Sequence, residues 1–414
     1  MDHGEEGPAR HAPKIGKSRR PIKPQPLVVF DKRRFFRIAL PSPRPAIPVD
    51  PHSPSSSPSA SRAAPVQEAI AALANRGSLS EQQTSEVFGC VMRGEATPAQ
   101  IAALLMGLRL KGETAAEVAG AARALRAAMV RVEVEDRHLV DTCGTGGGAV
   151  PTFNISTAAA LVAAGAGASV AKHGNRSFTS QCGSADVLEA LGVRITLDAA
   201  QAARVLREAC VTFLFAPNFH PAIKHAGPVR RELAVSTIMN LLGPLANPAG
   251  VRRQVVGVAE EDRAALLAGA LARLGTEHAL VVYGRIGMDE ISPIGITDVW
   301  EVRDREIKTW ELDPVRYGLA IEEAGALRGG DPGANAERIE RLLADGGGGD
   351  GAGLAAVVLN AGAAIYVSGI ARSFEEGLSR ARQVLASGAA RTALERLRRS
   401  TRRTDATDAA DAQG

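Results

Sequence analysis

The sequence is poor in aromatic residues and has no cysteine pair at the spacing of a zinc site or a redox motif. Aromatic side chains make up 4% of the 414 residues, whereas glycine occurs 43 times. No CxxC spacing occurs among the four cysteines, which are Cys90, Cys143, Cys182 and Cys210. Isolated cysteines favour reduced thiols in a cytoplasmic protein. We expect alanine-rich helices and glycine-rich loops in place of an aromatic core.

The sequence also lacks the apolar runs that mark membrane and secreted proteins. No run approaches the ~20 uncharged residues of a membrane span. The first residues include Asp2, Glu5 and Glu6, and prolines interrupt the segment that follows. No signal peptide is therefore predicted, and we expect no membrane partner.

The excess positive charge is confined to the first 62 residues. The chain has a net charge of +4, and residues 1–62 contain 12 Lys/Arg and 5 Asp/Glu, so they carry +7 and the rest carries −3. The remainder offers poor electrostatic support for a nucleic-acid partner, and we expect none. Residues 1–63 are rich in Pro, Ser and Arg, which is typical of disorder. A docking or targeting arm is the alternative interpretation of this leader.

Four helices are predicted before any strand. Their signals are apolar residues at helical spacing and Ser or Thr at the N-cap positions. The expected helices are Val66–Ala74, one capped by Ser80 that runs through Met92, Pro98–Lys111, and one capped by Thr114 that runs to Val130. We interpret residues 64–135 as a small helical domain, completed by helices from about 220–250.

The pattern then changes to strands that alternate with helices. The expected strands are His138–Asp141, Ser169–Ala171, Thr212–Ala216, Val255–Val258, Ala279–Val282 and one from Val299 onward. This alternation predicts an α/β domain over residues 136–400 with a mostly parallel central sheet and a site at the carboxyl ends of its strands. Further helices are expected at Ser184–Leu191, Leu354–Ser368 and Ser373–Leu397, before a polar tail at 401–414.

A glycine-rich loop follows the first predicted strand, in the segment Asp141–Gly148. Its glycines let backbone amides approach an anion, and the helix expected to open near Asn154 presents its N-terminal amides nearby. The segment fits the dinucleotide fingerprint only loosely, without the acidic residue that normally follows, and it lacks the Lys-Ser/Thr of a nucleotide loop. By itself it is equally consistent with anion binding and with a tight turn.

Three further loops carry groups suited to charged ligands. Lys172–Ser180 places two cations beside hydroxyls, which fits either a phosphate cradle or a solvated basic loop. Arg230 follows the loop Phe215–His225 and suits a planar carboxylate, whereas a lone histidine such as His220 is more often structural. The adjacent Asp289 and Glu290 suit a hard divalent cation, although such a pair on an ordinary surface is only solvated charge.

Together these loops resemble the anthranilate phosphoribosyltransferase family over about residues 66–400. The pieces that carry the resemblance are Gly144–Gly147, Thr152–Thr157, Lys172–Ser177, Gly183–Gly192, Asn240–Pro248 and Asp289-Glu290. The resemblance implies a small helical domain packed on a larger α/β domain, and a homodimer joined through the helical domains. It also implies phosphoribosyl diphosphate and anthranilate as substrates and Mg²⁺ as the cofactor.

The resemblance also assigns candidate site residues by position. The magnesium ligands would be Ser156, Asp289 and Glu290. Arg230 would face the anthranilate carboxylate and Asn175 would contact anthranilate. No general base is implied. The full set of candidate substrate-binding residues is Gly144, Gly147, Gly148, Thr152, Asn154, Ile155, Ser156, Thr157, Lys172, His173, Gly174, Asn175, Arg176, Ser180, Ser184 and Arg230.

Several positions depart from the family pattern. Gly148 stands where the family's glycine loop normally ends in Asp, and Phe178 occupies a usually smaller position. Ala234, Ser236 and Met239 stand where the family has Gly, Arg and Phe. The expected function is the ribosylation of anthranilate in tryptophan biosynthesis. The alternatives are a paralogue that ribosylates another aromatic amine, and a non-enzymatic homologue that binds nucleic acid or a partner protein.

Overall fold

The computed structural model describes residues 64–134, 139–177, 181–344, 346 and 349–411, with side chains as far as Arg403. The leader at 1–63, the start of the first expected strand at His138, the departure from the family pattern at Phe178 and the candidate residue Ser180 lie outside the described residues.

Four helices open the described chain, as the sequence predicts. They are α1 (Ala64–Ala74), α2 (Glu81–Met92), α3 (Pro98–Lys111) and α4 (Ala115–Ala128). Capping boxes begin three of them, at Ser80, Thr97 and Thr114, and each satisfies backbone N–H groups that the first helical turn leaves unpaired. The last helix ends two residues before the predicted end at Val130.

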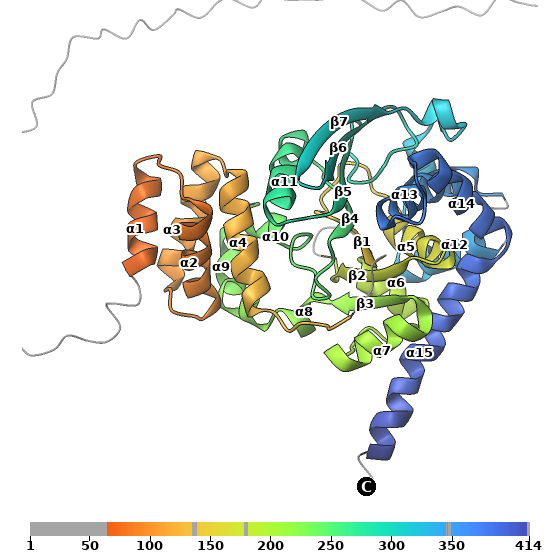
Figure 1. Cartoon of the computed structure of the whole chain (residues 1–414), viewed down its shortest axis with the longest axis horizontal. Helices are drawn as coiled ribbons and strands as arrows, with labels where there is room; N and C mark the ends of the chain where they lie inside the picture. Colours follow the sequence, from red (N-terminus) through yellow and green to blue (C-terminus); the bar gives the residue numbers. More distant parts are fainter. Residues whose placement is uncertain (1–63, 135–138, 178–180, 345, 347–348, 412–414) are drawn as a thin grey trace, which may run out of the picture. The chain divides into compact units, whose positions relative to one another are not determined.

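Short helices from residues 221–242 pack on this group. They are the 3₁₀ helix Pro221–His225, α9 (Gly227–Leu233) and α10 (Met239–Leu242), and they follow α8 (Ala216–Phe219), whose Phe219 belongs to a second core cluster. Helix α9 contacts α3, and α10 contacts α4; Figure 1 shows these short helices in green beside α4. Their apolar side chains share one core cluster with α1–α4, so this cluster contains chain from two distant parts of the sequence.

A seven-stranded sheet in the order β3-β2-β1-β4-β5-β6-β7 forms the centre of the larger part. The strands are β1 (Leu139–Gly144), β2 (Ser169–Gly174), β3 (Val211–Phe215), β4 (Arg253–Gly257), β5 (His278–Gly284), β6 (Thr297–Arg303) and β7 (Glu306–Leu312). The first five are parallel, and β6 and β7 are antiparallel. The predicted fold class, a small helical domain followed by a mostly parallel α/β domain, is confirmed.

The sheet separates two apolar cores. On β5, Leu280 and Val282 belong to the core formed with α5 (Ile155–Gly165) and α13 (Gly351–Ser368), whereas Ala279 and Val281 belong to the core shared with α1–α4 and α11 (Glu261–Arg273). Successive side chains of a strand point to opposite faces, so one strand contributes to both cores. The near-continuous apolar runs of the inner strands follow from this double burial.

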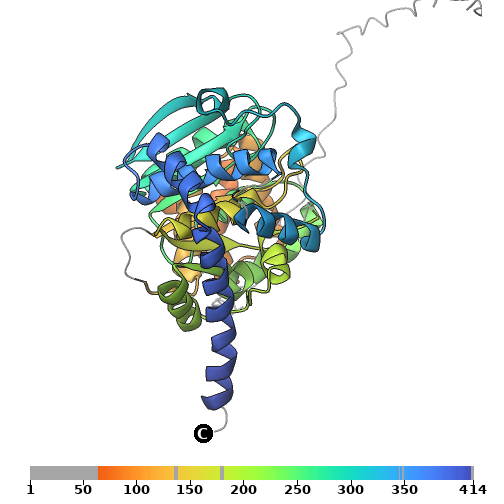
Figure 2. The same cartoon turned by 90° about the vertical axis from the view of Figure 1, so that its right-hand side faces the viewer.

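The remaining helices are α6 (Ser184–Ala190), α7 (Ala199–Ala209), α12 (Pro332–Ala344), α14 (Phe374–Ala386) and α15 (Ala389–Asp411), with 3₁₀ helices at Pro314–Tyr317 and Ala324–Leu327. Helix α15 is the long blue helix that runs downward in Figure 2. By length and composition α13 could cross a membrane, but most of it is buried inside the protein, where it packs against α5 and α14.

One expectation for the carboxyl-terminal region was wrong. The segment Ser373–Leu397, predicted as one helix, is divided between α14 and α15 by Gly388, whose φ is +73°. A left-handed glycine ends the first helix, and this conformation interrupts the helical backbone. The expected polar tail from 401 is helical as far as Asp411.

Ala234, the residue that replaces the family's glycine, ends α9 in a left-handed conformation with φ +52° and ψ +26°. A Cβ in this region costs roughly 1–2 kcal/mol, and glycine costs about 0.4–1 kcal/mol through the unfolded chain. We expect Ala234→Gly to raise the free energy of unfolding by about 0.5 kcal/mol, measured by urea denaturation. Ala103→Gly, at an exposed position in the middle of α3, should instead lower the free energy of unfolding. Equal destabilisation by both changes would contradict backbone strain at Ala234.

Candidate active site

The glycine-rich loop after β1 and the acidic loop after β5 lie against each other at the carboxyl edge of the sheet. The Thr145 amide donates to the Gly257 carbonyl over 2.9 Å, and the Ala149 amide donates to the Gly287 carbonyl over 2.8 Å. A Cβ on Gly257, at the end of β4, would lie 1.7 Å from the Asp289 carbonyl oxygen. The acidic loop therefore rests directly on the strand between β1 and β5, which requires glycine there.

The glycine-rich loop contacts the carboxylate of Asp289. The Gly146 amide donates to Oδ2 of Asp289 over 3.0 Å, and Gly146 and Gly147 have φ of +71° and +84°. A Cβ on Gly144 or on Gly148 would lie 2.9 Å from an Asp289 carboxylate oxygen. Two motifs more than 140 residues apart in the sequence therefore form one surface.

The amino-terminal turn of α5 is next to the second acid. The Ser156 amide donates to Oε1 of Glu290 over 3.3 Å, so a carboxylate occupies a position where a helix N-terminus favours an anion. Ile155 is fully buried, which leaves its backbone as the part that can meet a ligand, and the hydroxyl of Thr157 is buried without a partner among the described residues. Asn154 bonds the Cys182 carbonyl and the Asn335 side chain.

Lys172 connects β2 to β1 and to the start of α5. Its side chain is buried, and its Nζ donates to the Thr142 carbonyl and, over 3.2 Å, to the Ser156 hydroxyl. Burial lowers the pKa of Lys172, and the nearby Asp141 carboxylate opposes that shift. Burial raises the pKa of Asp141 to about 6, with Lys172 acting in the opposite direction. The two charges thus partly offset each other's loss of water.

Asp289 and Glu290 have the electrostatics of a cation site. Burial raises the pKa of both carboxyl groups, and the Asp289 charge raises that of Glu290 further. A divalent cation would relieve this repulsion, and carboxylate and hydroxyl oxygens are the ligands that Mg²⁺ accepts. No group of three or more His, Cys, Asp or Glu side chains in the described part of the chain could hold a metal. The fitting donors are therefore these two acids and the Ser156 hydroxyl, with further oxygens from water or phosphate.

The second loop is closely packed against the start of α6. A Cβ on Gly174 would lie 2.3 Å from Oγ of Ser184, and this hydroxyl donates to the Asn175 carbonyl over 3.3 Å. Arg176, a candidate substrate-binding residue, is exposed and forms ion pairs with Asp186 and Glu189. In this conformation its guanidinium holds the loop to α6, and its contact with substrate stays a prediction.

His173 joins the second loop to the third. Its Nδ1 lies 3.1 Å from the Gly243 carbonyl oxygen and its Nε2 lies 3.2 Å from Nε2 of His220. Because a carbonyl oxygen only accepts, Nδ1 of His173 carries the proton and Nε2 accepts from His220. Burial lowers the pKa of His173 to about 3 and that of His220 to about 4. Both rings are therefore neutral at physiological pH.

Arg230 lies on α9, one helix beyond this histidine pair. Burial lowers its pKa, and no hydrogen bond or ion pair joins its guanidinium to another residue that the structure describes. A partly buried, unpaired guanidinium is costly unless a ligand completes its hydrogen bonds. Of the positions that depart from the family pattern, Met239 is in the core around α4 and Ser236 is exposed.

Asp141, Asn247 and His220 were not identified from the sequence as residues that position the candidate site. Asp141 accepts from the His173 amide and from Nδ2 of Asn247, and Nδ2 of Asn247 also donates to the Ala171 carbonyl. The signal that could have revealed Asp141 is an acid at the end of an otherwise apolar strand, directly before the glycine-rich loop. Nothing local in the sequence indicates that His220 meets His173.

Two candidate residues remain, Thr152 before α5 and Asn175 in the second loop. Thr152 is half-buried in the segment before α5, and Asn175 is exposed, with its carbonyl facing α6. Of all the candidate residues, the structure brings the glycine loop, the start of α5, Lys172 and the acid pair into one continuous region. It links His173 to the loop that leads to Arg230.

Comparison with known families assigns the chain to a class of transferase. The helical bundle domain of the glycosyl transferase family matches residues 67–129, and the a/b domain of the same family matches residues 136–391.

Individual relatives narrow the class. The chain is 49% identical to the anthranilate phosphoribosyltransferase of Roseiflexus sp. (strain RS-1), over 80% of this chain and 97% of the relative. It is 47% identical to that of Methylobacillus flagellatus, over 80% and 96%. The chain belongs to the anthranilate phosphoribosyltransferase family.

Solved structures agree with this assignment. The crystal structure of anthranilate phosphoribosyltransferase from Thermus thermophilus is 43% identical, with a TM-score of 0.76 over 82% of this chain and 99% of that chain. The Saccharomyces cerevisiae enzyme in complex with PRPP and Mg is 27% identical, with a TM-score of 0.74 over 82% and 98%.

The acid pair gives a direct test of the metal site. We expect Asp289→Asn with Glu290→Gln to lower turnover by about 100-fold or more, since a bound cation contributes several kcal/mol to charge stabilisation. Carboxyl groups with raised pKa values cost stability above those values. The thermal midpoint at mildly alkaline pH should therefore not fall. Glu322→Gln with Glu323→Gln, an adjacent pair of exposed acids, should leave turnover unchanged. Activity retained at limiting magnesium would contradict the assignment.

Gly148 gives a second test, because its α-carbon faces the Asp289 carboxylate. A carboxylate there would repel diphosphate and attract additional cation. We expect Gly148→Asp to steepen the dependence of rate on magnesium and to produce inhibition at high magnesium, measured at fixed phosphoribosyl diphosphate. Gly148→Asn, of similar size, controls for crowding against the Gly287 carbonyl. Superimposable magnesium curves for the wild type and the Asp variant would show that this position is neutral.

Proposed function

We propose that this chain transfers the phosphoribosyl group of phosphoribosyl diphosphate to the amine of anthranilate, in tryptophan biosynthesis. The products are N-(5-phosphoribosyl)anthranilate and diphosphate. The observation that carries the proposal is the convergence of the glycine-rich loop, the α5 N-terminus, Lys172 and the acid pair on one edge of the sheet. The names and the bound PRPP and Mg of the relatives support it.

The residues present suit the departure of diphosphate. Negative charge grows on the leaving group, and fixed donors aimed at that charge stabilise the transition state. The donors are the amides of Gly146 and Ser156 and the Lys172 amine, each of which now has an internal partner. When bound, Mg²⁺ held by Asp289, Glu290 and Ser156 would neutralise phosphate oxygens.

Attack by the amine requires little proton transfer chemistry from the protein. An aromatic amine is neutral near neutral pH, so its lone pair is available without a strong base. Positioning then contributes most of the remaining acceleration. Arg230 would hold the acceptor carboxylate through a charged hydrogen bond, and Asn175 would contact the acceptor. This distribution of roles does not require a catalytic dyad.

Assembly and location form part of the proposal. We expect a homodimer joined through the helical regions and a cytoplasmic enzyme. The three expected partners are phosphoribosyl diphosphate, anthranilate and a second copy of the chain. The domain division at 64–135 and 136–400, with residues 220–250 added to the first, belongs to the same proposal.

A steady-state assay tests the function. The full chain is supplied with phosphoribosyl diphosphate, Mg²⁺ and a panel of aromatic amines, and diphosphate release is measured beside loss of the amine. We expect equimolar turnover and the highest kcat/KM for anthranilate. A higher kcat/KM for another amine would favour the paralogue hypothesis. Absence of diphosphate with every amine would favour a non-enzymatic homologue.

Arg230→Ala tests acceptor recognition. A charged hydrogen bond contributes roughly 1.5–3 kcal/mol, so kcat/KM for anthranilate should fall about 10- to 150-fold. The value for aniline, which has no carboxylate, should change little. Arg231→Ala removes an exposed neighbouring cation and should affect neither acceptor. Equal losses for anthranilate and aniline in Arg230→Ala would contradict the proposed contact.

A further inference from the structure

Helix α15 has one apolar face and one arginine-rich face. Its buried residues recur at helical spacing and are Ala390, Ala393, Leu394, Leu397, Ser400 and Thr401. This face packs against α5 and α7, which follows from the amphipathic pattern. The other residues from 391 to 403 include six arginines and one acid, namely Arg391, Glu395, Arg396, Arg398, Arg399, Arg402 and Arg403. Positive charge therefore accumulates on the outer side of the helix.

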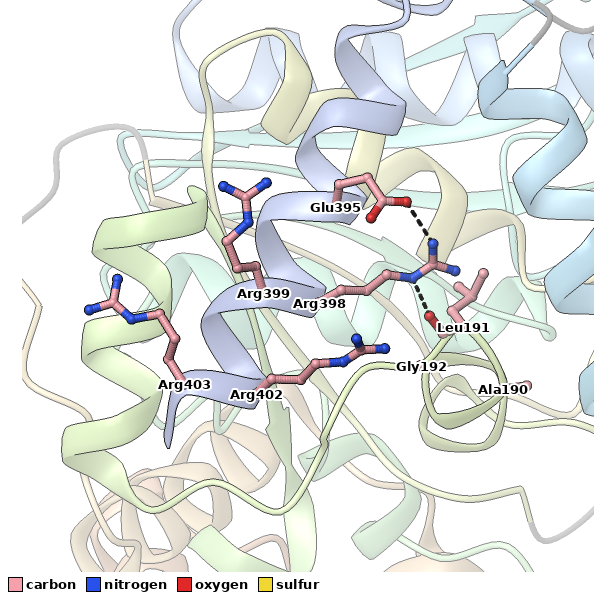
Figure 3. A pocket seen from close by; sticks show the side chains of 8 residues that line it. All are labelled: Ala190, Leu191, Gly192, Glu395, Arg398, Arg399, Arg402 and Arg403. Atoms are coloured by element: carbon pink, nitrogen blue, oxygen red, sulfur yellow. Dashed lines mark hydrogen bonds and ion pairs between the residues drawn. The ribbon is translucent and has the colours of Figure 1, made fainter. Parts of the chain in front are cut away.

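Four of these arginines line an open cavity of about 570 Å³ beside the end of α6, here called the arginine groove. Its lining residues are Ala190, Leu191, Gly192, Glu395, Arg398, Arg399, Arg402 and Arg403. Figure 3 shows Arg398 and Arg402 extending toward the turn at Leu191 and Gly192, and Arg399 and Arg403 extending to the other side of the helix. The groove lies at the opposite end of α6 from Ser184 and the candidate active site.

Arg398 is held in a fixed position. Its Nε donates to the Leu191 carbonyl, one terminal nitrogen pairs with Glu395 over 2.7 Å, and the other pairs with Glu340. Arginine next to the last carbonyls of a helix also interacts favourably with the helix dipole. This residue therefore attaches α15 to α6 and forms a rigid wall of the groove.

Arg402 brings a second guanidinium to the same turn. The position of a Cβ on Gly192 would lie 3.7 Å from Nη2 of Arg402 and 3.8 Å from Nε of Arg398. Gly192 has no side chain and a φ of +75°, so the space between the two cations stays open. Two like charges that approach one point repel each other unless an anion lies between them.

The neighbouring acids do not balance the groove. Four arginines and one acid line it, and the guanidinium groups of Arg398 and Arg402 are the two on the side of Leu191 and Gly192. Glu340 is paired with Arg398, and Glu208 lies 3.4 Å from Arg204 and 3.9 Å from Arg403. No carboxylate of a residue whose side chain the structure describes lies within ion-pair distance of Arg399 or Arg402. Among the side chains that the structure describes, the guanidinium groups of Arg399 and Arg402 therefore leave the groove with positive charge that no acid balances.

We propose that the arginine groove binds a small ligand that carries two or more phosphate groups. Guanidinium groups bind phosphate oxygens through paired hydrogen bonds and remain charged at any physiological pH. The volume is in the range of small-molecule sites. The positive charge of the groove is local, since residues 63–414 as a whole carry −3, and a small polyanion is the ligand that meets only this local charge.

Calorimetric titration of inorganic tripolyphosphate into the full chain, without magnesium, tests the proposal. Arg399→Gln with Arg402→Gln should weaken one class of binding about tenfold or more, as expected for lost charged hydrogen bonds. Arg391→Gln with Arg396→Gln removes the same charge from the same helix outside the groove, and it should leave the isotherm unchanged. Both double variants should keep the thermal midpoint and the rate of the full chain. Identical isotherms for the two double variants would overturn the proposal.

Two further titrations separate the groove from other anion sites. Gly148→Asp places a carboxylate that repels phosphate in the candidate active site, and the groove class of binding should persist in this variant. Its complete loss would show that tripolyphosphate binds at the candidate active site alone, which would overturn the proposal. A single-stranded oligonucleotide should bind more weakly than tripolyphosphate. Tighter binding that disappears with Arg399→Gln and Arg402→Gln would assign the groove to nucleic acid and overturn the small-ligand proposal.

Discussion

The candidate site depends on one buried charge, the amine of Lys172. Its Nζ bonds the Thr142 carbonyl on β1 and the Ser156 hydroxyl on α5, so it joins three consecutive elements behind the glycine-rich loop. A buried ammonium is tolerated only when it is paired and hydrogen-bonded. The buried Asp141 carboxylate supplies the opposite charge. A change at either residue would therefore leave an uncompensated charge in the core and alter the geometry of the site at the same time.

Asp141 extends this constraint to the segment that leads to Arg230. Its second oxygen accepts from Asn247, which also bonds the Ala171 carbonyl, while the first accepts from the His173 amide. His173 in turn contacts His220, in the segment that leads to Arg230. Because each of these groups is buried and has a specific partner, the position of the loop that leads to Arg230 relative to the glycine-rich loop is set by the packed interior. Networks of this kind favour a single arrangement of the core.

Much of this architecture is predictable from sequence. Ser80, Thr97 and Thr114 predict three helix starts because a cap is a local interaction, and the strand order places Asp289 at the edge that the loops share. The antiparallel β7 was not predicted, since its polar, mostly exposed residues give no apolar pattern. Asn247 and His220 were missed for a different reason: their roles come from partners 47 to 106 residues away. The break at Gly388 shows that one left-handed residue can divide a continuous helical pattern.

The backbone donors of the candidate site bond its two acids. The Gly146 amide bonds Asp289 and the Ser156 amide bonds Glu290, so the two carboxylates accept from the same amides that the proposed function assigns to diphosphate. Diphosphate alone would meet these two negative charges, and a cation alone would find only two carboxylates and a hydroxyl. When metal and diphosphate bind together, the positive charge of the metal offsets the repulsion between diphosphate and the two carboxylates, and phosphate oxygens complete the ligands of the metal. Burial raises the pKa values of both acids, which shows that their negative charges lack a nearby positive charge sufficient to compensate for the loss of water. The arrangement therefore favours joint binding of metal and diphosphate over binding of either one alone.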